Sequence, residues 1–139
     1  MLDGEGDDVA VRIHKGPINR ELPLGLLRSA VLLTLGQKIG YVTDVADTPS
    51  NRALIIDLVQ HSDLLFIEAP FAIADAQRAA ERAHLTTAAA GEIAREARAR
   101  RVEPFHFSPR YEGKEIEMME EVFAAFQRRA PPTTVASGS

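Results

Sequence analysis

A continuous apolar run, DLLFIEA, occupies residues 63–69 near the middle of the sequence. Such an unbroken run is typical of a parallel-sheet strand with both faces covered. Parallel strands need long crossover connections, which are usually helices. The run therefore predicts an α/β fold in which strands alternate with helices.

The other predicted strands fit this alternation. They are VAVRI at 9–13, KIGYVTD at 38–44 and VEPFHF at 102–107. Pro104 cannot donate a hydrogen bond to a neighbouring strand, so the last strand is expected at a sheet edge or a bulge. Residues 19–37 favour a short helix, although an apolar strand is the alternative.

Four further helices are predicted, beginning with one capped by Ser50. The others are expected at 72–83, from Thr86 or Thr87 to Arg100, and within 113–129. Two of these helices carry apolar residues at helical spacing. The expected inward-facing residues are Leu54, Ile55, Leu58 and Val59 in the first helix, and Ile116, Met119, Phe123 and Phe126 in the last.

Length and composition set limits on the class of protein. The 139 residues correspond to one domain, predicted at 9–129 between a flexible start, 1–8, and a disordered Pro/Ser/Thr-rich tail, 130–139. No stretch has the length of a membrane span, and the acidic start does not fit a signal peptide, so we expect a cytoplasmic protein. A net charge of −4 indicates that any nucleic-acid contact is local, and the lack of cysteine leaves only histidine and carboxylate groups as metal ligands.

Chemistry in parallel sheets collects at the carboxyl ends of the strands. This rule selects Asp44, Glu68 and His106, each at the end of a predicted strand, and His84 just before a helix can join them. Each also has a structural interpretation: a turn acid, a solvated or salt-bridged carboxylate, a partly buried imidazole and a helix-capping side chain, respectively. The remaining two histidines, His14 and His61, are expected at the surface.

Taken together, the segments resemble a known family. QKIGYVTDVADTPSNRALIIDLVQHSDLLFIEAPF, RAHLTTAAAGEIAREA and PFHFSPRY resemble, in this order, the C-terminal half of ribonuclease Z-like proteins of the metallo-β-lactamase superfamily. The resemblance covers about residues 36–126. It implies half of an αββα sandwich, a mainly parallel or mixed sheet with helices on one face.

The resemblance also implies roles for individual residues. Asp44 matches the aspartate that bridges two zinc ions, and His106 matches the last metal-ligating histidine. Glu68 and His84 match the pair that orients the scissile phosphate and passes a proton to the leaving oxygen. Arg110 is a further candidate for binding phosphate, with a structural salt bridge as the alternative.

The implied reaction is zinc-dependent hydrolysis of a phosphodiester, in precursor tRNA near its mature 3′ end. The sequence departs from the family pattern: no two histidines are separated by one residue, so the His-x-His-x-Asp-His motif is missing, as is the basic tRNA-binding arm. Ile67 and Pro70 stand where the ribonuclease Z motif has histidine and threonine. Two protein ligands cannot hold a catalytic zinc pair, so we expect the chain to be inactive by itself.

Three functions from different classes remain open. The chain is half of a ribonuclease Z-like enzyme whose partner is the missing N-terminal half, or a non-catalytic module that forms a homodimer. The third is an enzyme of the same fold that hydrolyses small esters. Ligands such as His14 or Asp47, or a subunit interface, would be needed to complete a zinc site within the chain alone.

Overall fold

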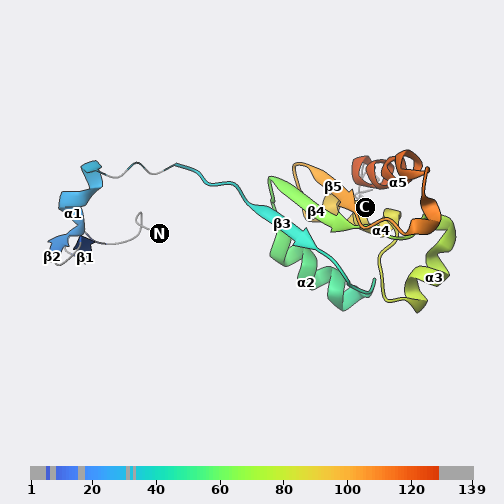
Figure 1. Cartoon of the computed structure of the whole chain (residues 1–139), viewed down its shortest axis with the longest axis horizontal. Coiled ribbons are helices and arrows are strands. Elements are labelled where there is room, and N and C mark those ends of the chain that lie inside the picture. Colours follow the sequence, from blue (N-terminus) through green and yellow to red (C-terminus); the bar gives the residue numbers. More distant parts are fainter. Residues whose placement is uncertain (1–5, 7–8, 16–17, 31, 33, 129–139) are drawn as a thin grey trace, which may run out of the picture. The chain divides into compact units, whose positions relative to one another are not determined.

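The computed structural model describes residues 6, 9–15, 18–30, 32 and 34–128. The chain divides into two compact units, Met1–Gly36 and Gln37–Ser139, and each is described by itself (Figure 1). The predicted tail, 130–139, and all of 1–8 except residue 6 lie outside the described residues. The predicted domain at 9–129 therefore stays a prediction.

The first unit is built on a hairpin. Strand β1 (Ala10–Lys15) pairs antiparallel with β2 (Ile18–Pro23), and a short helix, α1 (Leu24–Leu27), is followed by a 3-10 turn, η1 (Arg28–Ala30). The predicted first strand is present. The segment predicted as a short helix is helical only from Leu24, because its first residues find their backbone partners in β1.

The second unit contains a three-stranded parallel sheet in the order β3-β4-β5. Its strands are β3 (Ile39–Val42), β4 (Leu64–Glu68) and β5 (Val102–Phe105). The carboxyl ends of all three strands lie at the same edge of the sheet, since Val42 pairs with Ile67 and Glu68 pairs with Phe105. The strand that contains Pro104 lies at an edge of the sheet, as the sequence predicts.

Helices and 3-10 turns connect and follow these strands. Helix α2 (Pro49–Val59) joins β3 to β4. The segments between β4 and β5 are η2 (Ile73–Asp75), α3 (Ala76–Glu81) and α4 (Thr87–Glu96), and the chain continues after β5 through η3 (Pro109–Tyr111) and α5 (Glu115–Gln127). The fold is therefore α/β, as predicted.

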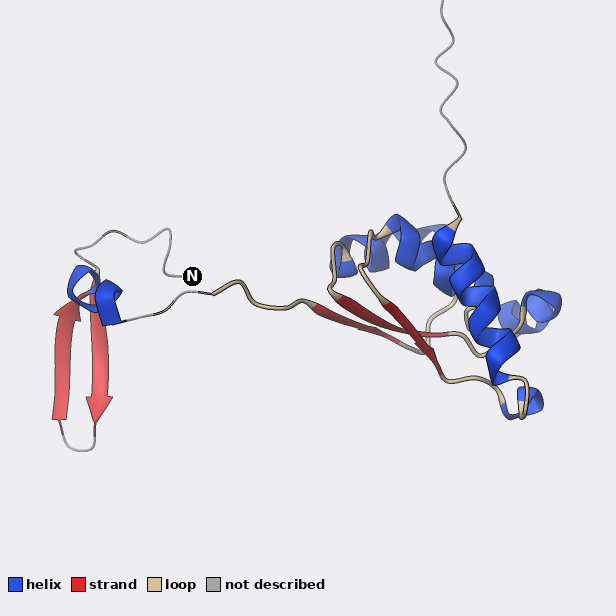
Figure 2. Ribbon diagram, turned by 90° about the horizontal axis from the view of Figure 1, so that it is seen from above, coloured by secondary structure: helices blue, strands red, loops and turns tan. Residues whose placement is uncertain are grey.

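The helices α2, α4 and α5 lie on one side of the sheet (Figure 2). The core forms between them and this face, where Val42, Leu65 and Ile67 are buried. Their neighbours in the core are residues of the covering helices, among them Ile55, Val59, Ala90, Ile93 and Val122. Coverage by helices on one face is what the family resemblance implies.

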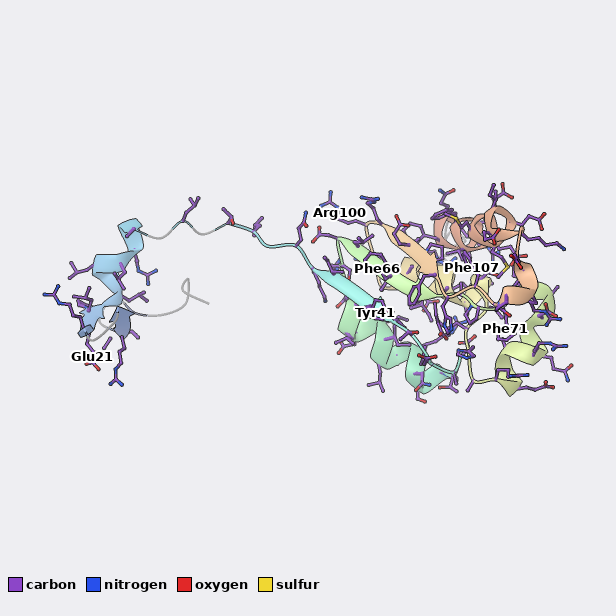
Figure 3. The ribbon with its side chains drawn as sticks, in the orientation of Figure 1. Glu21, Tyr41, Phe66, Phe71, Arg100 and Phe107 are labelled. Atoms are coloured by element: carbon purple, nitrogen blue, oxygen red, sulfur yellow. The ribbon has the colours of Figure 1, made fainter. Side chains whose placement is uncertain are left out.

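The opposite face of the sheet has no covering helix among the described residues. Ile39 and Tyr41 are 60% and 64% exposed. The ring of Tyr41 stacks on Phe105 with centroids 5.0 Å apart and lies 6.4 Å from Phe66 (Figure 3). The apolar run at 63–69 is therefore covered on one face only by the described residues, as expected for half of an αββα sandwich.

Two details of the helices nearest the sheet differ from the sequence predictions. Helix α2 is capped by Thr48, whose hydroxyl accepts a 3.2 Å hydrogen bond from the Asn51 N–H, and not by Ser50. Ser50 lies within the first turn because Pro49 already begins the helix. Leu54 and Leu58, predicted to face inward, are each 71% exposed, since α2 packs on the sheet only through the side that carries Ile55 and Val59. By contrast, Thr86 caps α4 as predicted.

The buried face of α5 also differs from its prediction. Met118, Val122 and Ala125 are the buried residues, whereas Ile116 is 74% exposed. Of the predicted Ile116, Met119, Phe123 and Phe126 stripe, only Ile116 is exposed; the buried face is displaced toward Met118, Val122 and Ala125. Phe123 and Phe126 are partly buried at its margins. Among the described residues, no helix is long and apolar enough to cross a membrane.

Candidate metal centre

The carboxyl ends of the three parallel strands bring the predicted site residues together. Asp44 follows β3, Glu68 ends β4, and His106 comes directly after β5; His84 lies in the turn before α4. Each of the four side chains offers a ligand atom, and these atoms all lie within 4.8 Å of one another. The structure thus gathers the four residues into one cluster, while their individual roles stay predictions.

Glu68 is the centre of this cluster and is fully buried. Its carboxylate accepts backbone hydrogen bonds from Asp44 at 2.8 Å, Leu85 at 3.2 Å and Val45 at 3.4 Å. The Nδ1 atoms of His84 and His106 lie 3.1 Å and 3.3 Å from it. The carboxylate therefore connects the loops after β3 and β5 with the start of α4.

The hydrogen bonds determine the charge state of Glu68. Burial alone would raise the pKa of this carboxyl, but the hydrogen bonds from the Asp44 N–H, the His84 imidazole and the backbone N–H groups of Leu85 and Val45 outweigh burial and hold the pKa below its ordinary value. An ionised carboxylate only accepts hydrogen bonds, so both imidazoles donate through Nδ1. This arrangement leaves Nε2 of each imidazole available for another interaction.

The backbone at the site adopts an uncommon conformation. Asp44 and His106 have φ values of 52° and 64°, and Ala83, next to His84, has a φ of 56°. Residues other than glycine rarely occupy this left-handed region, at a cost of order 1–3 kcal/mol, and such residues cluster at functional sites. No residue-type pattern in the sequence signals these conformations.

The donor types in the cluster fit zinc, which binds histidine nitrogen and carboxylate oxygen at about 2.0–2.2 Å. Glu68 does not fit the role of ligand, because five donors already surround its two oxygens. Asp44 and His106 are exposed and retain a free carboxylate oxygen and an Nε2 atom, respectively. The described residues thus fit part of a zinc site, with Glu68 fixing the orientation of the imidazoles.

The other candidates from the sequence lie apart from this cluster. Arg110 forms a 3.7 Å ion pair with Asp75. Asp47 pairs with Arg52, whose Nη2 lies 3.0 Å from its Oδ2, so this carboxylate is engaged in a salt bridge. His61 is exposed, as predicted. The side chain of His14 lies outside what the structure describes.

A cavity of about 170 Å³ lies beside the cluster. His84 and His106 line it together with Pro70, Phe71, Arg82, Phe107, Ser108 and Pro109. Sequence reasoning did not identify Arg82 or its neighbour Arg78. The available signal was their i, i+4 spacing on a helix, which places two like charges side by side at a cost to helix stability.

Comparisons with known proteins support this description of the fold. No family model matches the chain. Ribonuclease Z from Phocaeicola vulgatus is 40% identical over 86 residues, which are 62% of this chain and 26% of that protein. Ribonuclease Z from a Nostoc species is 38% identical over 98 residues, which are 68% of this chain and 29% of that protein. Ribonuclease Z from a Synechocystis species is 37% identical over 101 residues, which are 73% of this chain and 30% of that protein.

A solved structure extends the comparison to the fold. The metallo-β-lactamase fold protein YhfI from Bacillus subtilis superposes with a TM-score of 0.53 and 22% identity, covering 84% of this chain and 37% of that one. The chain is therefore an α/β protein of the metallo-β-lactamase fold. Its sequence is similar to those of ribonucleases Z over 62–73% of its length. It spans about 24–31% of the length of the ribonucleases Z that it matches.

Proposed function

We propose that the chain supplies the C-terminal part of a zinc-dependent phosphodiesterase of the ribonuclease Z type, which cleaves precursor tRNA near its mature 3′ end. The observation that carries this proposal is the cluster of Asp44, Glu68, His84 and His106, with ligand atoms within 4.8 Å of one another. The similarity to ribonucleases Z supports the choice of substrate. We propose the cytoplasm as its location.

Asp44 and His106 would hold zinc in this proposal. Zinc, when bound, lowers the pKa of water and neutralises charge that develops on phosphate oxygens. A catalytic zinc ion normally has about three protein ligands, so two ions need more groups than these two residues provide. The remaining ligands then come from a polypeptide segment with a His-x-His-x-Asp-His motif, and without them the chain binds zinc weakly and is inactive.

His84 has the role of proton donor in the proposal. Glu68 accepts its Nδ1–H, which fixes the ring and directs the other nitrogen, Nε2, to the substrate. The imidazole borders the cavity of about 170 Å³, where a phosphodiester has room to enter. In its doubly protonated form, His84 would hydrogen-bond the scissile phosphate through Nε2–H and transfer that proton to the leaving oxygen, while Glu68 acts as its positioning residue.

The test begins with zinc content by elemental analysis and solution mass, measured on the same sample of the chain. The chain is then mixed with a polypeptide carrying the His-x-His-x-Asp-His segment of a ribonuclease Z, and cleavage of precursor tRNA is measured. In this complex, we expect His106→Ala to lose zinc and activity together. His84→Ala should keep its zinc and lose turnover. Equal zinc content and equal turnover in both variants would contradict the assigned roles.

The exposed face of the sheet favours a second candidate function. Ile39 and Tyr41 form part of an apolar surface that no described helix covers, which suits a non-catalytic module that dimerises through this face. A stable homodimer that lacks zinc and does not cleave precursor tRNA when complemented would favour that candidate over the enzyme. Hydrolysis of a small phosphodiester in preference to precursor tRNA by the complemented chain would instead indicate a small-ester hydrolase.

A further inference from the structure

A second cavity adjoins the one beside His84 and His106. It measures about 280 Å³ and is lined by Phe71, Arg78, Arg82, Ser108 and Arg110. Three of these residues, Phe71, Arg82 and Ser108, also line the cavity of about 170 Å³. The two hollows are therefore neighbours with a common wall, and the surface continues from the two imidazoles to the arginines; Figure 3 labels Phe71 in this wall.

Arg78 and Arg82 give this cavity an excess of positive charge. They lie four residues apart at the end of α3, so their side chains leave the helix on the same side. Neither guanidinium group forms a hydrogen bond or ion pair with another described residue. The nearby carboxylates are engaged elsewhere, because Asp75 pairs with Arg110 at 3.7 Å and Glu81 accepts a 3.1 Å hydrogen bond from Gln77.

A purely structural role accounts poorly for this pair. Cations near a helix C-terminus interact favourably with its dipole, but α3 has only six residues, and two adjacent like charges repel each other. Unpaired guanidinium groups in a concave site are well suited to oxyanions, since each presents a planar fork of N–H donors. The cavity thus has the charge and the donor groups of a phosphate-binding position.

We propose that Arg78 and Arg82, with Arg110, bind a backbone phosphate of an RNA strand next to the phosphate that lies at His84 and His106. This inference rests on the proposed phosphodiesterase function and specifies its substrate class. A strand with several phosphates occupies both cavities, whereas a small ester with one phosphate occupies only the first. The second cavity thus favours a polynucleotide strand over a small ester, and its basic lining compensates locally for the acidic net charge of the chain.

The test measures binding of a uridine tetranucleotide to the full chain without metal, in EDTA, by NMR titration at 50 and 200 mM NaCl. The variant Arg78→Gln/Arg82→Gln removes two charges from the cavity. The matched control, Arg98→Gln/Arg101→Gln, removes two exposed charges near the start of β5, at the opposite end of that strand from His106. The spectrum of each free variant shows whether its fold is retained.

We expect the Arg78→Gln/Arg82→Gln variant to bind the tetranucleotide about tenfold more weakly at 50 mM NaCl, with a smaller dependence of affinity on salt. The control should stay within about twofold of the unmodified chain. Equal weakening in both variants, or no binding by the unmodified chain, would overturn the proposal. Since binding is measured without metal, a chain that binds through these arginines but does not cleave when complemented contradicts only the proposed function.

Discussion

At the scale of single residues, Glu68 shows how a buried charge can organise a site. Its carboxylate receives three backbone N–H groups and two imidazoles, so it satisfies the donors of three separate loops. The sequence places Glu68 at a strand end, but no pattern in it reveals that the residue is fully buried. Burial follows from the convergence of the loops after β3 and β5 on the start of α4, which is a property of the tertiary fold.

The substitution Glu68→Gln tests this description. The glutamine amide keeps the shape of the side chain but replaces one acceptor oxygen with a donor that faces backbone N–H groups. Hydrogen bonds to a charged group contribute roughly 1.5–3 kcal/mol each, and unsatisfied buried donors add a penalty. We expect the free energy of unfolding, measured by urea denaturation, to fall by about 2–4 kcal/mol.

Glu103→Gln provides the matched control. Glu103 forms a long, 3.5 Å ion pair with Arg101 at the surface, and exposed pairs of this kind contribute about 0–1 kcal/mol. We expect the control to change the free energy of unfolding by less than about 0.5 kcal/mol. A similar loss of stability in both variants would mean that Glu68 does not act as the common acceptor of the site.

At the scale of secondary-structure elements, the sequence predicts strands and helices better than it predicts their buried faces. The strands at 39–42, 64–68 and 102–105 and the cap at Thr86 follow from apolar runs and capping chemistry. The centre of the inward face of α5 does not, because Met118, Val122 and Ala125 are buried while Phe123 and Phe126 pack at its margins. Hydrophobic spacing favours large residues, whereas a close helix contact selects small ones.

Gly91 is the residue that permits this close contact between α4 and α5. A Cβ atom at this position would collide with the backbone carbonyl of Val122 and lie 2.7 Å from the Cβ of Ala125. The obstacle includes backbone, so α5 itself would have to move. The position of α5 behind the sheet therefore depends on a glycine that helix propensity alone would disfavour.

We expect Gly91→Ala to lower the free energy of unfolding by about 1–3 kcal/mol, as overpacking in a core does, despite the higher helix propensity of alanine. Thermal or urea unfolding checks this value. Gly36→Ala makes the same chemical change where a Cβ meets no atom within 4 Å, so it should have little effect. If Gly91→Ala proved as stable as Gly36→Ala, the packing of α5 on α4 would be looser than described.

At the scale of the whole chain, its match to only part of a metallo-β-lactamase fold agrees with the absence of a described helix over one face of the sheet. The apolar run of β4 is typical of a strand covered on both sides in a complete fold, whereas half of a sandwich leaves one side bare, and the described helices cover one side. The order of the motifs along the sequence was sufficient to predict the fold, because three successive strands end at or shortly before Asp44, Glu68 and His106. No motif in the sequence identifies what covers the exposed face.

An uncovered apolar sheet face favours association, because burial of apolar surface contributes roughly 25 cal/mol per Å². We expect the chain to self-associate at high concentration, as measured by sedimentation velocity, and Tyr41→Ser to raise the dissociation constant about tenfold. Tyr41 is suited to this test because it is 64% exposed and stacks on Phe105, so it contributes to the face without supporting the core.

The control for Tyr41→Ser is Leu54→Ser/Leu58→Ser, which removes two leucines that are each 71% exposed on α2. Both variants reduce the apolar surface, but only the first alters the bare side of the sheet. Selective loss of association in Tyr41→Ser would assign the contact to that side. A monomer at every concentration, or equal weakening in both variants, would show that the sheet face does not drive association, and the dimerising module would then lose its structural support.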